Sequence, residues 1–145
     1  VDRLRGFTRA PLQEREHAAI ALAATDPANP YGAALPWPAV PGEAGTGHRP
    51  GRKAGALVVL VDGELALYVE RGGKSLLSFA DPEDAEATAT LAAASRALAA
   101  LVTSRRVDKL AVETVNGGFV LGTPTGDALA EAGFLPIPRG LRLRS

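Results

Sequence analysis

The sequence predicts an α+β fold: a mostly antiparallel sheet, one long helix packed on it and a short second helix. Two observations support this class. Three strand-like segments, 56–61, 64–70 and 75–79, follow one another with turn sequences between them. A segment with helical spacing comes next, and shorter strand-like pieces follow it. Strands grouped before a helix, rather than alternating with helices, favour α+β over a parallel α/β sheet. The pattern leaves open whether the sheet is barrel-like.

The three grouped segments predict a β-meander. Residues 56–61 form a continuous apolar run, which is typical of a strand buried on both faces. Asp62-Gly63 is a favoured pair for a two-residue hairpin turn. Residues 64–70 then alternate in polarity, as expected of a strand with two different faces. The alternation places Leu65, Leu67 and Val69 on one face and Ala66, Tyr68 and Glu70 on the other.

The long helix is predicted over residues 82–106. Asp81 is suited to its N-cap and Pro82 to its first position. Arg105 and Arg106 would close it at the negative end of the helix dipole. Apolar residues at three- and four-residue spacing predict one buried stripe: Leu91, Ala94, Leu98 and Leu101. This stripe would pack the helix on the sheet.

Shorter elements complete the prediction. They are a strand at 18–24, a hairpin of 109–115 with 119–122, a helix from Thr123-Pro124 through Ala132 closed by Gly133, and extended segments at 135–137 and 141–144. Together the elements predict one β-rich domain over 17–145, with a flexible loop at 39–54 that is rich in Gly and Pro. The arginine-rich residues 1–16 are expected to be a connector from a preceding module.

Composition argues against several function classes. Lys plus Arg and Asp plus Glu both number 16, so the overall basic charge of an autonomous nucleic-acid binder is missing. With no cysteine and two histidines, His17 and His48, we expect no metal site. The glycine-rich segment 42–48 lacks the Lys-Ser/Thr ending of a phosphate-binding loop, so we expect no nucleotide cofactor. No run of eighteen apolar residues occurs, and we expect a cytoplasmic protein without a membrane partner. The chain has no methionine, and we interpret it as a piece of a longer protein.

A stiff, aromatic loop stands out at residues 25–38. Four prolines restrict its backbone and exclude a helix. Its two large rings, Tyr31 and Trp37, could stack on nucleic-acid bases or pin the loop to the sheet. Asp26 could serve as the lone carboxylate of a glycosylase beside a flipped base. The simpler interpretation is that it caps a turn, because Asp before Pro often accepts a nearby backbone N–H.

Cations gather in three places and are candidates for phosphate contact. At the end of the chain arginine alternates with leucine, so a strand there would carry its leucines on one face and Arg142 and Arg144 on the other. That arginine face would meet phosphate or simply solvent. The complete set of candidates is Arg49, Arg52, Lys53, Arg71, Lys74, Arg139, Arg142 and Arg144.

Three separate blocks resemble the Lhr (large helicase-related) family of bacterial nucleic-acid helicases. They are the DPANPYG…LPWP segment within 26–38, the stretch 55–63 with 68–73, and the end of the chain at 131–134 with 138–144. The resemblance implies the C-terminal domain of a protein whose ATP-driven 3′-to-5′ motor acts in DNA repair and lies elsewhere. ATP and Mg would bind that parent helicase, with no cofactor in this fragment. The implied partners are preceding winged-helix modules, further copies of the chain, and DNA or RNA.

Two functions follow from this resemblance. The first is a non-catalytic accessory domain for oligomerisation and nucleic-acid guidance, of which a purely structural cap is a limiting case. The second is a DNA (uracil) glycosylase module, because the family's C-terminal region has been likened to winged-helix glycosylases. Its catalytic carboxylate would be Asp26 or another lone acid. The sequence shows no Gln-x-Gln or Gln-x-Asp pair of the kind those glycosylases use, since Gln13 is its only glutamine.

Overall fold

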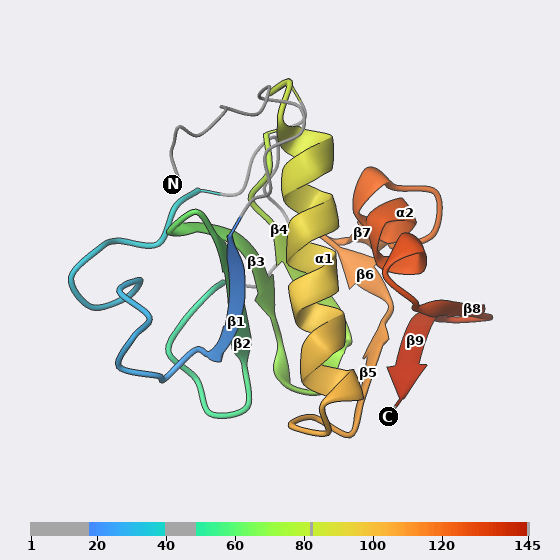
Figure 1. The fold of residues 1–145 in the computed structure, drawn as a ribbon, viewed down its shortest axis with the longest axis horizontal. Coiled ribbons are helices and arrows are strands. Elements are labelled where there is room, and N and C mark those ends of the chain that lie inside the picture. The colour runs from blue at the N-terminus through green and yellow to red at the C-terminus, as the bar shows by residue number, and fades with distance from the viewer. Residues whose placement is uncertain (1–17, 40–48, 82, 145) are drawn as a thin grey trace, which may run out of the picture.

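The computed structural model describes residues 18–39, 49–81 and 83–144 (Figure 1). Their strands form two sheets, one of six strands in the order β1-β2-β3-β4-β6-β7 and one of three in the order β5-β9-β8. Helix α1 lies across one face of the larger sheet, and α2 packs beside α1 (Figure 1). The α+β class is therefore confirmed. The predictions for 1–16, His17 and 40–48 concern residues outside the described ranges.

The predicted meander is present. Strands β1 (Ala19–Ala23), β2 (Leu57–Val61), β3 (Glu64–Val69) and β4 (Ser75–Ser78) pair in chain order, each antiparallel to its neighbour. Asp62 and Gly63 both have positive φ, 53° and 86°, as a tight hairpin turn between β2 and β3 requires. A short helical turn, η2 (Arg71–Gly73), connects β3 to β4. The strand predicted at 18–24 is confirmed as β1, at the edge of the sheet.

A bulge in β3 changes the predicted faces of that strand. Val59 pairs with Leu67 and Leu60 pairs with Leu65, so Ala66 is an extra residue without a partner in β2. Leu65 therefore turns to the face that carries Tyr68, and Ala66 joins Leu67 in the core beneath α1. The prediction of strict alternation from residue 64 was wrong at Leu65 and Ala66, because the inserted residue reverses the side-chain parity.

The segment predicted as one strand at 109–115 divides between the two sheets. Strand β5 (Lys109–Val112) pairs with β9 (Gly140–Arg144), which also pairs with β8 (Leu135–Ile137). Strand β6 (Thr114–Val115) instead pairs parallel with β4 and antiparallel with β7 (Gly118–Phe119). The backbone N–H groups of Glu113 and Thr114 both donate to the Lys74 carbonyl, at 2.9 and 3.1 Å, where the chain changes sheets. Among the described strands both sheets remain open, and a barrel-like closure is not found.

Helix α1 (Ala87–Thr103) is shorter than the predicted 82–106. The Asp81 carboxylate accepts the N–H of Glu83, and the Asp84 carboxylate accepts the N–H of Glu86, each at 2.9 Å. These two successive turns carry the chain to an N-cap at Glu86, so the prediction of Asp81 as N-cap was wrong.

The end of α1 is also earlier than predicted. Arg105 has a φ of 69°, its N–H donates to the Val102 carbonyl, and the Arg106 N–H donates to the Leu101 carbonyl. This is a Schellman motif, with Arg105 in the left-handed position that glycine usually fills. Helix α2 (Pro124–Glu131) begins as predicted, since the Thr123 hydroxyl accepts the Gly126 N–H at 2.9 Å.

Apolar side chains pack on both faces of the larger sheet. The main cluster lies between the sheet and α1 and includes the predicted helix stripe, Leu91, Ala94, Leu98 and Leu101. A second cluster on the opposite face contains Val58, Leu60, Tyr68 and Leu77 from the sheet and Tyr31 from the 25–38 loop. The continuous apolar run of β2 is explained by these two cores, because Val58 and Val59 are both fully buried on opposite faces.

Candidate nucleic-acid interface

Cations collect on the outer face of the three-stranded sheet. Arg144 lies directly opposite Lys109, and Arg142 lies opposite Ala111 of β5 and Leu135 of β8. The leucines that alternate with these arginines point the other way: Leu141 is buried in the main core and Leu143 packs against it. The predicted separation of leucine and arginine faces is confirmed. None of the three strands contains an acidic residue, although Asp108 stands directly before β5 and Glu113 directly after it.

A glycine fixes the register of this sheet. Gly140, the first residue of β9, has a φ of 151°, and a Cβ there would collide with the Val112 carbonyl oxygen. Only glycine allows β9 to approach β5 this closely. Side chains alternate between the two faces of a sheet, so a shift of β9 by one residue would move its arginines to the other face. The close approach at Gly140 prevents such a shift and keeps Arg142 and Arg144 together on the outer face. Arg139, in the turn before Gly140, is exposed at the end of the same strand pair.

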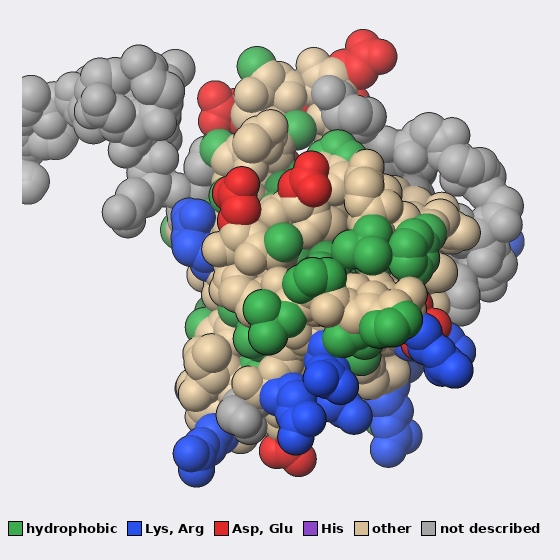
Figure 2. All heavy atoms as spheres, turned by 90° about the vertical axis from the view of Figure 1, so that its right-hand side faces the viewer, with side chains coloured by type: hydrophobic (Ala, Val, Ile, Leu, Met, Phe, Trp, Pro, Cys, Tyr) green, Lys and Arg blue, Asp and Glu red, His purple; other side chains and the backbone are tan. Residues whose placement is uncertain are grey.

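An exposed apolar side chain borders the cations. Leu135, which pairs with Arg142, is 67% exposed, the highest value among the large apolar residues described, followed by Ile20 and Phe119 at 52% each. Figure 2 shows Lys and Arg side chains gathered along the lower part of this face of the molecule, below a band of hydrophobic ones. The face can therefore offer positive charge to phosphates and apolar contact beside it.

Two further candidates lie at the η2 turn, which packs against β5. A Cβ on Gly73 would stand 3.1 Å from the Leu110 side chain and 3.2 Å from the Ala111 nitrogen. Lys74 and Arg71 are exposed, and the methylene stem of Arg71 lies over Gly55. The turn thus lies beside the strand that carries Lys109, while the Arg71 side chain extends over Gly55.

Arg52 is used inside the protein. Its Nη1 donates to the carbonyls of Asn29 and Tyr31, at 2.8 and 2.9 Å, and its Nη2 donates to those of Asp26 and Thr25, at 3.1 and 3.4 Å. Four backbone acceptors from the 25–38 loop therefore surround one guanidinium. This arrangement ties the loop to the segment before β2, and it engages both terminal nitrogens that a phosphate would need.

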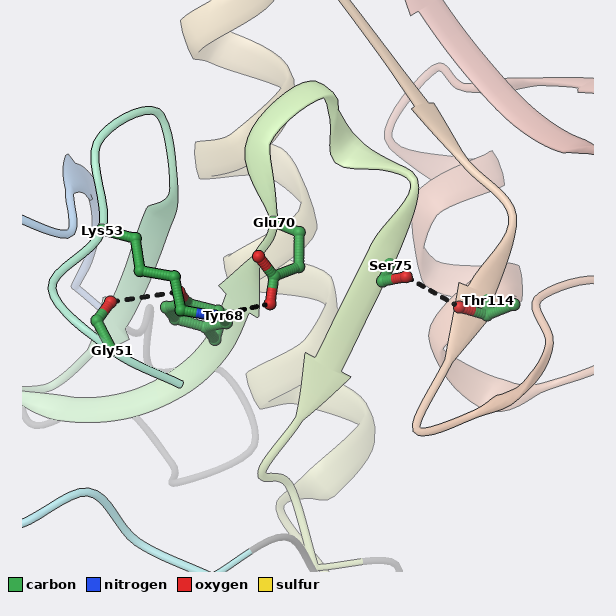
Figure 3. Close-up of polar contacts among 6 residues, drawn as sticks. All are labelled: Gly51, Lys53, Tyr68, Glu70, Ser75 and Thr114. Carbon is green, nitrogen blue, oxygen red and sulfur yellow. Dashed lines mark hydrogen bonds and ion pairs between the residues drawn. The ribbon is translucent and has the colours of Figure 1, made fainter. Parts of the chain in front are cut away.

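Lys53 and Arg49, the other cations of this segment, differ in their environment. The Lys53 ammonium lies 3.6 Å from the Glu70 carboxylate (Figure 3). Arg49 is exposed. Neither lies on the strands of the cationic sheet face.

The loop aromatics face inward. Tyr31 is 9% exposed, and its hydroxyl accepts the Leu65 N–H at 3.2 Å. Trp37 stacks on Tyr31 with ring centroids 6.2 Å apart and meets Tyr68 edge-on at 5.7 Å. A Cβ on Gly32 would stand only 2.7 Å from the Trp37 indole nitrogen. The rings therefore pin the loop to the sheet, which was the second of the two roles considered.

Asp26 caps a turn in the same loop. Its carboxylate accepts the Ala28 N–H at 2.8 Å, as Asp before Pro commonly does. Asn29, three residues further on, is buried; it donates to the Ala24 carbonyl at 2.9 Å and accepts the Tyr31 N–H at 3.0 Å. The loop thus encloses its polar groups in its own hydrogen bonds.

Sequence reasoning did not single out Lys109, Tyr68 or Glu70 as site residues. Tyr68 donates to the Gly51 carbonyl at 3.0 Å (Figure 3), and burial, with Glu70 as the second cause, raises the pKa of its hydroxyl above 10.0. The alternation along the strand placed Tyr68 and Glu70 on one face, but it gave no sign of the hydrogen bond to Gly51. The proximity of Lys109 to Arg144 needed the pairing of β5 with β9.

Two further observations concern only the part of the chain that the structure describes. It contains no group of three or more His, Asp or Glu residues able to hold a metal ion. Neither of its helices is long and apolar enough to cross a membrane.

Fold and site together define a small α+β domain that displays a cationic strand face. No model of a known protein family matches the chain. It is 53% identical over 152 residues to "Lhr helicase/ probable uracil glycosylase" of Mycolicibacterium smegmatis, an alignment that covers 99% of this chain and 10% of that protein. It is 40% identical over 143 residues to "Lhr helicase/uracil glycosylase" of Escherichia coli K12, covering 97% of this chain and 9% of that protein. The chain thus corresponds to a small, domain-sized segment of an Lhr helicase, which confirms the family resemblance, and it spans about a tenth of the length of these relatives.

Proposed function

We propose that this domain is a non-catalytic accessory part of an Lhr-type ATP-dependent helicase, in which it guides a nucleic-acid strand. The observation that carries the proposal is the cationic sheet face: Lys109 of β5 lies beside Arg142 and Arg144 of β9, in a sheet whose three strands contain no acid. Phosphate contacts are sequence-independent and suit a motor that must pass along any strand. In this proposal the parent protein works in the cytoplasm, it binds ATP and Mg outside this domain, and the complete helicase acts in DNA repair.

The zero net charge of the chain agrees with guidance better than with autonomous binding. A local group of three cations would increase the affinity of the helicase for a nucleic-acid strand that the motor already holds. Free of the motor, the domain should bind weakly and with a strong dependence on salt. The same face would accept DNA or RNA, because phosphates are common to both.

Titration with labelled single-stranded DNA at two salt concentrations tests the proposal. Replacing both Arg142 and Arg144 with Ala should lower the slope of log affinity against log salt by about 1.4, since each phosphate contact to a single strand contributes about 0.7. Arg96→Ala is the matched control, because Arg96 is exposed on α1, outside the sheet. Equal salt slopes for the double variant and the control would contradict guidance by this face.

Assembly is the second part of the proposed accessory role. Leu135 and Phe119 are exposed to an extent that favours contact with a preceding winged-helix module or with another copy of the chain. Light scattering of the isolated chain distinguishes these two, since only self-assembly raises the mass. A Leu135→Asp variant should remain monomeric, whereas a wild-type monomer at high micromolar concentration would leave only the winged-helix contact.

A second candidate is a uracil glycosylase module. It is favoured by one observation, that both relatives carry uracil glycosylase in their names. Asp26 would then supply the carboxylate, and Asp26→Asn is an apt test because an Asn side chain can still accept the Ala28 N–H. Cleavage of a uracil-containing strand by the wild type, abolished in this variant, would support the enzyme. Intact strands would remove it.

A further inference from the structure

A strained residue lies at the end of α1. Arg105 has a φ of 69°, in the left-handed region that residues other than glycine rarely adopt. The turn around it is fixed by hydrogen bonds, because its N–H donates to the Val102 carbonyl at 3.0 Å. The N–H groups of Arg106 and Val107 both donate to the Leu101 carbonyl, at 3.0 and 3.1 Å, and Val107 packs against the main core. Glycine would adopt this conformation without strain, so arginine lowers the stability of the domain at this position.

No contact of the Arg105 side chain offsets this strain in the part of the chain that the structure describes. The side chain is exposed, and its guanidinium makes neither an ion pair nor a hydrogen bond there. A cation at the C-terminal end of a helix is favoured by the helix dipole. The exposed Arg106 already supplies such a charge at the next residue, where φ is not positive. Backbone strain without an internal compensation is typical of residues that contact a ligand.

The strained turn adjoins the cationic sheet face. Arg105 precedes Lys109, the first residue of β5, by four residues, so their Cα atoms are at most about 14 Å apart. Arg144 lies directly opposite Lys109. The end of α1, the start of β5 and the end of β9 lie together at the lower end of the molecule in Figure 1. Residues 104–109 hold three cations and one acid, Asp108, so positive charge continues from the sheet to the end of the helix.

These cations follow a bend in the surface. Leu141 and Leu143 of β9 belong to the core that α1 covers, so α1 lies on the leucine side of this strand. Arg142 alternates with them and lies on the other side. A ligand that contacts both Arg142 and Arg105 must therefore turn round the end of the β5–β9 pair, past Lys109. A single strand can follow such a bend, whereas a duplex, with a persistence length of about 150 base pairs, resists it.

We propose that Arg105 is a phosphate-binding residue, which continues the nucleic-acid surface from the outer sheet face round onto the end of α1. The proposal rests on the proposed role of the domain in guiding a strand, and it adds a contact on a different element. A guanidinium suits this role, because its fork of N–H donors pairs with two phosphate oxygens. The fixed turn holds the exposed side chain at one place beside the sheet, and the bend favours a single strand over a duplex.

DNA titration at two salt concentrations and thermal unfolding of the same Arg105 variants test this. In Arg105→Gly the slope of log affinity against log salt should fall by about 0.7 for a labelled single strand, the contribution of one phosphate contact. The melting temperature should rise in the same variant, because the strain is removed. Arg105→Lys retains the charge and should retain the wild-type slope. For a blunt duplex of the same length the slope should be equal in wild type and Arg105→Gly, because the duplex does not reach the end of α1.

Two results would overturn the proposal: a single-strand slope in Arg105→Gly equal to that of wild type, or a duplex slope that falls as much as the single-strand slope. If Arg105→Gly fails to fold, Arg105→Asn decides the matter, because Asn is uncharged and tolerates the left-handed conformation. Failure here is distinguishable from failure of guidance by the sheet face. A slope lowered only in the Arg142 and Arg144 double variant would leave guidance without Arg105. A slope lowered only in Arg105→Gly would support the contact at α1 and contradict guidance by the sheet face.

Discussion

Arg144 and Lys109 lie directly opposite each other across the β5–β9 pair, so two positive charges face each other on one sheet surface. Like charges at such a position destabilise a sheet, whereas opposite charges stabilise it. The arrangement costs stability within the domain and gains attraction for phosphate. A surface used for nucleic acid would retain such a pair, and a purely structural surface would not benefit from it.

Lys109→Glu should therefore raise the stability of the domain and weaken its binding of DNA. We expect the free energy of unfolding to rise by up to about 1 kcal/mol as the pair becomes attractive, and affinity for single-stranded DNA to fall. Denaturant unfolding and DNA titration on the same sample measure both quantities. Lys109→Gln, which only removes the charge, should fall between wild type and Lys109→Glu in both. A variant more stable than wild type that binds DNA equally well would mean that this face does not meet phosphate.

Arg52 should be a stability residue. Its guanidinium donates four hydrogen bonds to backbone carbonyls of the 25–38 loop, the shortest to Asn29 at 2.8 Å. Charge-assisted hydrogen bonds contribute about 1.5–3 kcal/mol, and we expect Arg52→Ala to lower the free energy of unfolding by about 2–3 kcal/mol. Arg52→Lys should recover little, because an ammonium cannot span the carbonyls as a planar fork does. Arg49→Ala, at an exposed position nearby, should change stability by less than about 0.5 kcal/mol.

Much of the fold follows from sequence period and turn chemistry. The run 56–61, the Asp62-Gly63 turn and the leucine–arginine alternation at the end of the chain each specified a strand and its faces correctly. The bulge at Ala66 could not be predicted, because Leu-Ala-Leu-Tyr reads as a regular strand with or without the extra residue. The local sequence pattern determines that a segment is a strand. It does not determine where an extra residue interrupts the pairing of that strand with its neighbour.

The site was only partly predictable for a related reason. Arg142 and Arg144 were recognised from their own strand, but Lys109 joins them through a pairing between segments far apart in the sequence. In the sequence Arg52 is a candidate for phosphate contact, because it lies in a basic run. The structure shows instead that its neighbours in space are carbonyl oxygens, which carry no signature in the sequence. Aspartates caused the error at α1, since Asp81 and Asp84 can both cap a turn.

Arg105→Gly should stabilise the domain. Arg105 occupies the left-handed position after α1 with a φ of 69°, a conformation that costs a non-glycine residue about 1 kcal/mol or more. We expect the melting temperature to rise by a few degrees, because a change of about 1 kcal/mol shifts Tm by about 2–8 °C in domains of this size. Arg106→Gly removes the same charge at a neighbouring exposed position without positive φ, and it should lower stability slightly. Equal shifts in the two variants would show that charge, not backbone conformation, is responsible.

Tyr68 should make stability fall at alkaline pH. Burial, and secondarily the charge of Glu70, raises the pKa of its hydroxyl above 10.0 in the folded protein. The folded state therefore holds the phenolic proton more tightly than the unfolded state does. Its contribution is fully present below pH 10 and is lost as the pH rises towards the folded pKa. Near neutral pH, Tyr68→Phe should cost about 1 kcal/mol, since it removes the hydrogen bond to the Gly51 carbonyl.

Denaturant unfolding of wild type and Tyr68→Phe at pH 8 and pH 11 checks this expectation. The stability advantage of the wild type over Tyr68→Phe should shrink or reverse at pH 11. At that pH the unfolded wild type releases the Tyr68 proton more readily than the folded wild type does, and Tyr68→Phe has no such proton. Glu70→Gln supplies a second variant: with the neighbouring negative charge gone, the folded pKa of Tyr68 moves back towards 10.0 and the alkaline loss becomes smaller. A wild-type advantage that is the same at both pH values would show that the Tyr68 hydroxyl ionises equally well in the folded and unfolded states.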